Sequence, residues 1–211
     1  MRARKVLDKT RDMARPQGFY FSKHGWGMVY AYVNSYSEAR SVAKIAYLLA
    51  LECGMPFAAA KKTRTAAFLH DVGKVLVPAR ILNKRGPLHP AEFGLVKDHT
   101  IYGAWILRGV KGCLGRVVRM AALYHHEWAD GSGYWGKNLS LLPAYVEVVA
   151  IADVFTALTA KRPYKRAWTV KEALSFIECR SGSQFTPRIA GVFVSLASKD
   201  KRIAEALDPA V

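Results

Sequence analysis

Apolar side chains recur along most of this chain at the three- and four-residue spacing of an α-helix. In residues 36–51, Val42, Ile45 and Leu49 fall on one face, and Pro56 follows shortly after this pattern ends. The same spacing predicts further helices over residues 58–69, 90–107, 114–124, 143–159, 170–177 and 187–196. Strand-like alternation is nearly absent. We therefore predict an all-α bundle of about seven helices, whose ligand site is built from inward-facing side chains.

The length of 211 residues suits one domain with one hydrophobic core. We expect a basic and aromatic N-terminal extension over residues 1–30, the domain over residues 31–200, and a C-terminal tail over residues 201–211. No apolar run is long enough for a membrane helix, and the N-terminus lacks the apolar segment of a signal peptide. These features predict a cytoplasmic protein with no membrane partner.

The charge is strongly positive, with 32 Lys and Arg against 16 Asp and Glu and a formal net charge of +16. Such a field attracts phosphate-bearing ligands, nucleic acid or acidic protein surfaces. The basic residues are spread along the chain and form no single tail. This dispersion is more typical of a solvated surface than of a nucleic-acid interface.

Histidines and carboxylates occur together at the ends of several predicted helices, and one further carboxylate interrupts an apolar run. These residues are His70, Asp71, His99, His125, His126 and Asp153. A carboxylate on a buried helix face is costly unless it is paired, protonated or bound to a cation. Imidazole nitrogens and carboxylate oxygens together suit iron, manganese or zinc, and this many ligands fit two ions better than one. The pattern predicts a metal site.

Three motifs in this order resemble the HD-GYP family of the HD phosphohydrolase superfamily. Residues 70–74 read HDVGK and are similar to the HDxGK signature; residues 125–134 read HHEWADGSGY and are similar to HHExxDGxGYP; residues 161–165 read KRPYK and contain the RPYK element. The resemblance spans about residues 35–195. It implies an HD-domain helical bundle and makes residues 31–200 an HD-GYP-like phosphodiesterase domain.

In that family, cyclic di-GMP is hydrolysed to linear pGpG, GMP or both by a hydroxide that bridges metal ions. The resemblance implies a cofactor of two divalent ions, or three, with iron or manganese favoured. Carried over by position, the implied metal ligands are His70, Asp71, His99, His125, His126 and Asp153, with Asp71 bridging. These assignments make a bacterial signalling hydrolase the expected class of protein.

The resemblance also implies residues that act on the substrate. Asp71 and Lys74 would be catalytic, because the Lys74 ammonium would lie near the scissile phosphate and offset charge that develops in the transition state. Arg162 and Lys165 would bind the phosphates of the dinucleotide, and Tyr134 would contact the substrate or shape the pocket.

Two positions depart from the family pattern. Glu38 stands where the family has a further histidine ligand; it either coordinates a metal as a harder, anionic ligand or faces solvent and leaves one metal weakened. Trp135 replaces the proline of the GYP motif. It either stacks on a guanine base or makes a packed hydrophobic contact.

The departures leave alternatives to a cyclic di-GMP phosphodiesterase. One is a catalytically degenerate module that binds the nucleotide, or a protein such as a diguanylate cyclase domain through Gly133, Tyr134 and Trp135. Another is a different nucleotide phosphohydrolase of the HD superfamily. A nucleic-acid-binding protein, suggested by the charge, is ranked last because the ligand set is preserved.

Overall fold

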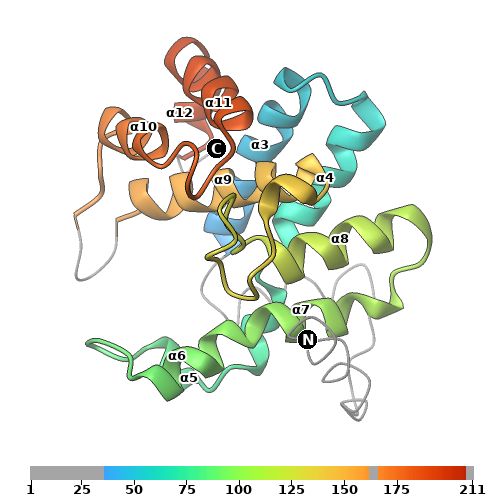
Figure 1. The fold of residues 1–211 in the computed structure, drawn as a ribbon, viewed down its shortest axis with the longest axis vertical. Helices are drawn as coiled ribbons and strands as arrows, with labels where there is room; N and C mark the ends of the chain where they lie inside the picture. Colours follow the sequence, from blue (N-terminus) through green and yellow to red (C-terminus); the bar gives the residue numbers. More distant parts are fainter. Residues whose placement is uncertain (1–35, 162–165, 208–211) are drawn as a thin grey trace.

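The computed structural model describes residues 36–161 and 166–207, and every regular element within these ranges is helical, which confirms the all-α prediction. The α-helices are α3 (Tyr36–Glu52), α4 (Phe57–Leu69), α5 (Ala79–Leu82), α6 (Pro90–Lys97), α7 (His99–Ile106), α8 (Gly112–Tyr124), α9 (Ala144–Thr159), α10 (Val170–Cys179), α11 (Pro187–Lys199) and α12 (Lys201–Glu205) (Figure 1). The 3-10 helices are η1 (Val72–Leu76), η2 (Leu107–Gly109) and η3 (Leu139–Leu141).

The helix predicted over residues 90–107 is wrong in one respect, because the chain breaks it into α6 and α7 at Asp98. The Asp98 N–H still bonds to the Gly94 carbonyl at 3.2 Å, so the interruption is a local turn. The reason lies in burial. Helix α6 buries no side chain, whereas α7 buries most of its residues, so the chain turns here from the surface into the core. The short helices α5 and α12 were not predicted.

The core is centred on α9, which is drawn in light orange in Figure 1. Helix α3 packs against α4 and α9, and α4 packs in turn against α8. Ile45 and Leu49 of α3 and Ile151 and Phe155 of α9 are fully buried. Burying one such side chain contributes about 1.5–3 kcal/mol, so the spacing of apolar residues on these helices explains why they assemble.

The packing brings four chain segments together at one place. Helix α7 lies against η1 and α8, and α4 and α8 both pack against α9. As a result, the C-terminal ends of α4 and α8, the N-terminal end of α7 and the middle of α9 can present side chains to a common centre. None of these segments is close to all the others in sequence.

The C-terminal helices are attached to α9 by a buried polar contact. Glu147, which is 3% exposed, accepts hydrogen bonds from the Thr186 backbone N–H at 2.6 Å and its hydroxyl at 2.9 Å. Ile203 of α12 is fully buried against the core. No helix in the described ranges combines the length and apolar character needed to cross a membrane. The predicted N-terminal extension lies outside the described residues.

Candidate metal and phosphate site

A close contact between the backbones of η1 and α7 positions Asp71, the first carboxylate of the site. Helix α4 ends at Leu69, and Asp71 lies at the N-terminus of η1. Gly73 then packs η1 against α7 so tightly that an added Cβ would lie 1.9 Å from the His99 carbonyl oxygen. Only glycine fits this approach, and it brings the Asp71 carboxylate to the start of α7.

Three histidine rings are oriented by backbone carbonyls of the turn that precedes them. The contacts are His70 Nδ1 to Ala67 O at 2.6 Å, His99 Nδ1 to Val96 O at 2.6 Å, and His125 Nδ1 to Ala121 O at 3.0 Å. A ring that donates its Nδ1–H to a carbonyl presents the lone pair of Nε2 on its other side. This arrangement is the usual way in which metal-binding histidines are held.

The three Nε2 atoms point toward Asp71. His99 Nε2 lies 3.1 Å and His125 Nε2 3.7 Å from Asp71 Oδ1. His70 Nε2 lies on the other side, 3.3 Å from Asp71 Oδ2 and 3.4 Å from Asp153 Oδ1. Asp71 therefore stands between two sets of nitrogen atoms, one oxygen facing each.

Two groups of potential ligand atoms result, each with all its atoms within 4.8 Å of one another. The first group comprises Asp71, His99, His125 and His126, and the second comprises His70, His125 and Asp153. The structure thus brings together six of the seven residues predicted as metal ligands. Glu38 belongs to neither group; it is half-buried in the first turn of α3, and its role as a ligand stays a prediction.

The polar atoms at this centre are not satisfied by the protein alone. His70 Nε2 and Asp71 Oδ1 are buried and have no hydrogen-bond partner. Burial lowers the pKa of His126 to about 4 and lowers the pKa of His125 well below its usual value, so both rings are neutral at pH 7. Neutral imidazoles and an orphaned carboxylate oxygen are the donor set that a divalent cation needs.

The carboxylate charge is held in place by neighbouring cations. Burial by itself would raise the pKa of Asp71, but Lys74 and His70 outweigh it and hold the pKa well below its usual range. Burial would lower the pKa of His70, but Asp71 and Asp153 outweigh it and raise this pKa to about 10, so His70 would have to release its Nε2 proton to bind a metal. The Lys74 ammonium contacts Asp71 Oδ2 directly, while 32% of the Lys74 side chain remains exposed. Lys74 is therefore both paired at the centre and accessible to an anion from outside.

Phe93, Lys97 and Tyr134 form an aromatic and cationic rim beside His126, just after the C-terminal end of α8. The Tyr134 ring lies 4.5 Å from the His126 ring, tilted by 36°. Lys97 Nζ lies 5.1 Å from the Tyr134 ring centroid and 5.0 Å from that of Phe93. Burial raises the pKa of Tyr134 to about 12, so its hydroxyl stays protonated and can donate a hydrogen bond. Lys97 was missed by sequence reasoning, because only the fold brings it next to Tyr134.

Trp135 is a packed residue in this structure. Its ring lies against the small cluster of Ile101 and Leu123, and its indole N–H donates to the Thr100 hydroxyl at 3.0 Å. The second of the two predictions for Trp135, a packed contact, is therefore confirmed. Trp135 replaces the family proline by anchoring the loop to α7 through its side chain.

Glu127 fixes the same loop and was also missed. It is 1% exposed, and its two carboxylate oxygens accept the backbone N–H groups of Trp135 at 2.7 Å and Lys137 at 2.6 Å. Gly133 passes so close that an added Cβ would lie 2.5 Å from Glu127 Cα. The signal in the sequence was the acid directly after the histidine pair, but the loop it binds lies 8 to 10 residues further on.

We expect Glu127→Gln to destabilise the fold by about 1–3 kcal/mol, because the amide offers one acceptor oxygen and turns an NH₂ group toward the second buried N–H. Urea unfolding measures the change. Glu178→Gln, at an exposed position of α10, is the matched control and should leave the midpoint unchanged. Equal midpoints for the two variants would show that Glu127 does not hold the loop.

Arg162 and Lys165, the predicted phosphate ligands, lie outside the described residues, so their role stays a prediction. Arg166, the next residue along, is turned to an ion pair with Glu172 at 2.6 Å. The predicted roles of Lys74 and Tyr134 toward a substrate are likewise predictions; the structure places both side chains beside the histidine cluster.

Comparison with known families gives a match to the HD domain over residues 30–189. The chain belongs to the HD-domain family. This HD domain is 39% identical over 145 residues, 68% of the chain, to the cyclic di-GMP phosphodiesterase response regulator RpfG of Xanthomonas campestris pv. campestris. It is 39% identical over 149 residues, 70% of the chain, to a cyclic di-GMP phosphodiesterase of Thermotoga maritima. These relatives confirm the resemblance derived from the motifs. The matched regions span 38% and 40% of the relatives' own lengths.

Solved structures confirm the fold of this HD domain. The phosphodiesterase PgpH HD domain of L. monocytogenes, in complex with cyclic-di-AMP, superposes with a TM-score of 0.63 at 19% identity, covering 85% of this chain and 97% of that one. Bd1817, an HDG"Y"P protein of Bdellovibrio bacteriovorus, gives a TM-score of 0.60 at 17% identity over 76% of this chain and 51% of that one. At such identities the likeness concerns the fold alone.

Proposed function

We propose that this HD domain is a metal-dependent phosphodiesterase that hydrolyses cyclic di-GMP to linear pGpG, GMP or both. The observation that carries the proposal is the convergence of five predicted ligand side chains on the sixth, Asp71, where two buried polar atoms make no hydrogen bond. The relatives named as cyclic di-GMP phosphodiesterases support the choice of substrate.

The donor set fits divalent cations. The residues proposed to hold them are His70, Asp71, His99, His125, His126 and Asp153, with Asp71 facing both groups. Mixed imidazole and carboxylate donors favour iron or manganese. When bound, such ions supply Lewis-acid stabilisation of charge on the phosphoryl group and lower the pKa of water beside it. Glu38 remains a proposed additional ligand; its charge acts on Lys74 from α3.

The chain's own residues bind and orient the substrate. The partly exposed ammonium of Lys74 lies where it can pair with a phosphate oxygen and offset the charge that grows on it. Tyr134 and Lys97 form the rim next to His126, where the phenol can donate to a phosphate or base and the ammonium can pair with a second phosphate. Arg162 and Lys165 are proposed to complete the phosphate contacts.

The test is product formation from cyclic di-GMP by protein loaded anaerobically with Fe²⁺ or Mn²⁺, with bound metal counted on the same sample. We expect pGpG or GMP to appear, and to disappear after chelation and return with metal. Nucleotide binding without product, despite two bound metals per chain, would favour the degenerate module instead.

A second candidate substrate is 3′3′-cGAMP. A Vibrio cholerae protein named 3′3′-cGAMP-specific phosphodiesterase 2 is 39% identical over 137 residues, 64% of this chain and 26% of that protein. Parallel rates with both dinucleotides decide between them. A kcat/KM that is higher for 3′3′-cGAMP would replace cyclic di-GMP in the proposal.

A diguanylate cyclase domain remains a proposed partner of the loop formed by residues 133–135. Because Trp135 is packed inward, such a partner would meet the neighbouring exposed residues Ser132 and Gly136.

We expect Lys97→Ala to raise KM for the dinucleotide about 5- to 10-fold and to leave kcat within about 3-fold, because the rim contact is made equally in the ground and transition states. Steady-state kinetics measure both constants. Lys171→Ala removes an exposed lysine on α10 and serves as the control. A loss confined to kcat would contradict a binding role for Lys97.

A further inference from the structure

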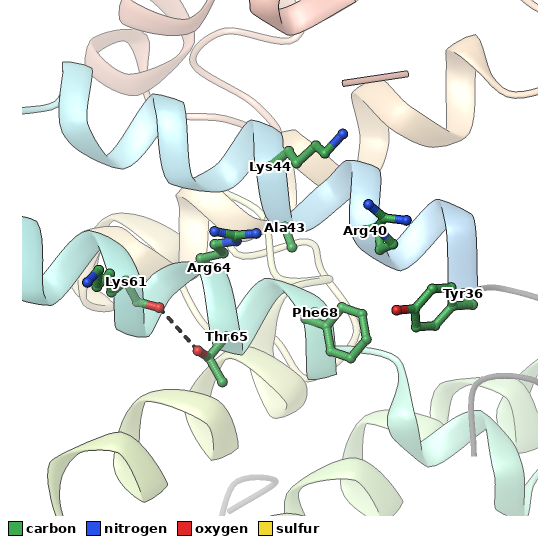
Figure 2. A pocket seen from close by; sticks show the side chains of 8 residues that line it. All are labelled: Tyr36, Arg40, Ala43, Lys44, Lys61, Arg64, Thr65 and Phe68. Carbon is green, nitrogen blue, oxygen red and sulfur yellow. Dashed lines mark hydrogen bonds between the residues drawn. The ribbon is translucent and has the colours of Figure 1, made fainter. Parts of the chain in front are cut away.

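A basic cavity of about 470 Å³ lies between α3 and α4, outside the histidine cluster (Figure 2). Four of its lining residues are cations: Arg40 and Lys44 from α3, and Lys61 and Arg64 from α4. Two more are aromatic, Tyr36 and Phe68, and none is acidic. The volume is in the range of small-molecule sites and too small for a protein domain or a duplex.

The spacing of these residues creates the cavity. Tyr36, Arg40 and Lys44 follow one another at four-residue intervals on α3, and Lys61, Arg64 and Phe68 follow at three and four on α4. Each set therefore forms one stripe, and the two stripes face the same cavity. Bundle packing does not require them, since Arg40, Lys61 and Arg64 are all exposed.

Aromatic rings that are not part of the cavity lining contact two of these cations. The Lys61 ammonium lies 4.3 Å from the Phe57 ring centroid, and the Arg64 guanidinium 5.9 Å from that of Tyr47. Such contacts contribute about 0.5–1 kcal/mol at exposed sites and position a cation without neutralising it. Lys61 and Arg64 therefore keep a positive charge that an anion can use.

We propose that this cavity binds a nucleotide through a terminal phosphate, with the phosphate between the cations of α3 and α4 and the base against Tyr36 and Phe68. A terminal phosphomonoester carries a charge of about −1.5 to −2 at pH 7, about one and a half to two times that of a diester phosphate, and pairs better with several cations. Guanidinium groups from both helices can bind its oxygens in pairs. Tyr36 is 47% exposed and lies edge-on to Phe68, with ring centroids 5.8 Å apart. The Arg40 guanidinium lies over the Tyr36 ring, 6.0 Å from its centroid, so a base would stack on the opposite face of this ring.

The cavity is separate from the metal cluster. Residues two apart on a helix point about 200° from each other. On α3, Arg40 faces the cavity, whereas the charge of Glu38 acts on Lys74. At the end of α4, Phe68 faces the cavity, whereas His70 faces Asp153. The same pair of helices thus carries a phosphate site on one side and part of the metal cluster on the other. A ligand that ties α3 to α4 would also restrain the position of His70.

Titration calorimetry with GMP tests the proposal, using the whole chain with a chelator present so that no metal holds nucleotide at the cluster. We expect one GMP to bind per chain, with an affinity that falls as salt is added. Guanosine and the diester cyclic GMP should each bind at least about 10-fold more weakly than GMP. Arg40→Glu and Arg64→Glu should each raise Kd at least about 10-fold. The matched control Arg188→Glu, exposed at the start of α11, should leave Kd unchanged.

The other outcomes overturn the proposal. GMP that does not bind, or that binds all variants equally, would show that the cavity takes no nucleotide. Equal affinity for cyclic GMP and GMP would show that the terminal phosphate is not recognised. Binding of an RNA oligomer or an acidic peptide but not of GMP would show that the basic residues of α3 and α4 bind a polymer instead. Circular dichroism checks that each variant is folded, and Arg64→Gln replaces Arg64→Glu if the reversed charge unfolds the chain. The result does not depend on turnover of cyclic di-GMP, so the two proposals can fail separately.

Discussion

Asp71→Ala is expected to lower the rate of cyclic di-GMP hydrolysis by at least about 1000-fold and to remove at least one bound metal per chain. Asp71 faces both ligand groups, with Oδ1 near His99 and Oδ2 near His70, and His125 belongs to both groups. Losing an ion that stabilises phosphoryl charge costs several kcal/mol of transition-state stabilisation, and each 1.36 kcal/mol is tenfold in rate. Phosphodiesterase assays and metal analysis on the same sample measure both effects.

The control removes a carboxylate of no expected function. Glu178→Ala lies at an exposed position of α10 and should keep rate and metal content unchanged. Asp71→Asn tests the charge alone, since it keeps the shape of the side chain. If Asp71→Ala retained both metals and more than a tenth of the activity, the cluster would not be the catalytic centre.

Gly73→Ala is expected to destabilise the protein by about 3 kcal/mol, because the new methyl group would meet backbone, which cannot move aside as a flexible side chain can. The added Cβ would lie 1.9 Å from the His99 carbonyl oxygen and 2.4 Å from the Gly103 nitrogen. For a chain of this size the melting temperature should fall by roughly 6–12 °C. Thermal unfolding followed by circular dichroism measures it.

Gly94→Ala is the matched control. Gly94 lies in the exposed helix α6, and a Cβ there would meet nothing within 4 Å. We expect it to be neutral or to stabilise the fold by up to about 1 kcal/mol, because alanine has the higher helix propensity. Similar melting temperatures for the two variants would mean that η1 can move away from α7 at little cost, and that Gly73 does not set the position of Asp71.

Coupling between the two sides of α3 and α4 follows if both proposals hold. The helix pair carries His70 and Glu38 on one side and the cations of the basic cavity on the other. A nucleotide product that bound the cavity would then influence the centre that forms it. Measuring hydrolysis with added GMP in the wild type and in Arg64→Glu separates this effect from competition at the metal cluster, which both proteins would share.

The sequence determined the helices and most of the candidate site by itself. Helix formation depends on contacts three and four residues apart, so the apolar spacing of residues 36–51 and 143–159 is enough to locate α3 and α9. His70, Asp71 and the pair His125 and His126 were recognisable because adjacent polar residues at helix ends, in motifs of fixed spacing, are a local pattern.

Only the tertiary structure decided the features that depend on contacts between distant segments. The break at Asp98 arises because α6 lies on the surface and α7 in the core, although the apolar spacing runs through both. Trp135 packs inward because Thr100 and Ile101 lie beneath it. The basic cavity exists because α4 lies beside α3, and the charge pattern of either helix alone resembles an ordinary solvated face. Local patterns fix elements, whereas burial and the closeness of separate elements are set by how the helices pack.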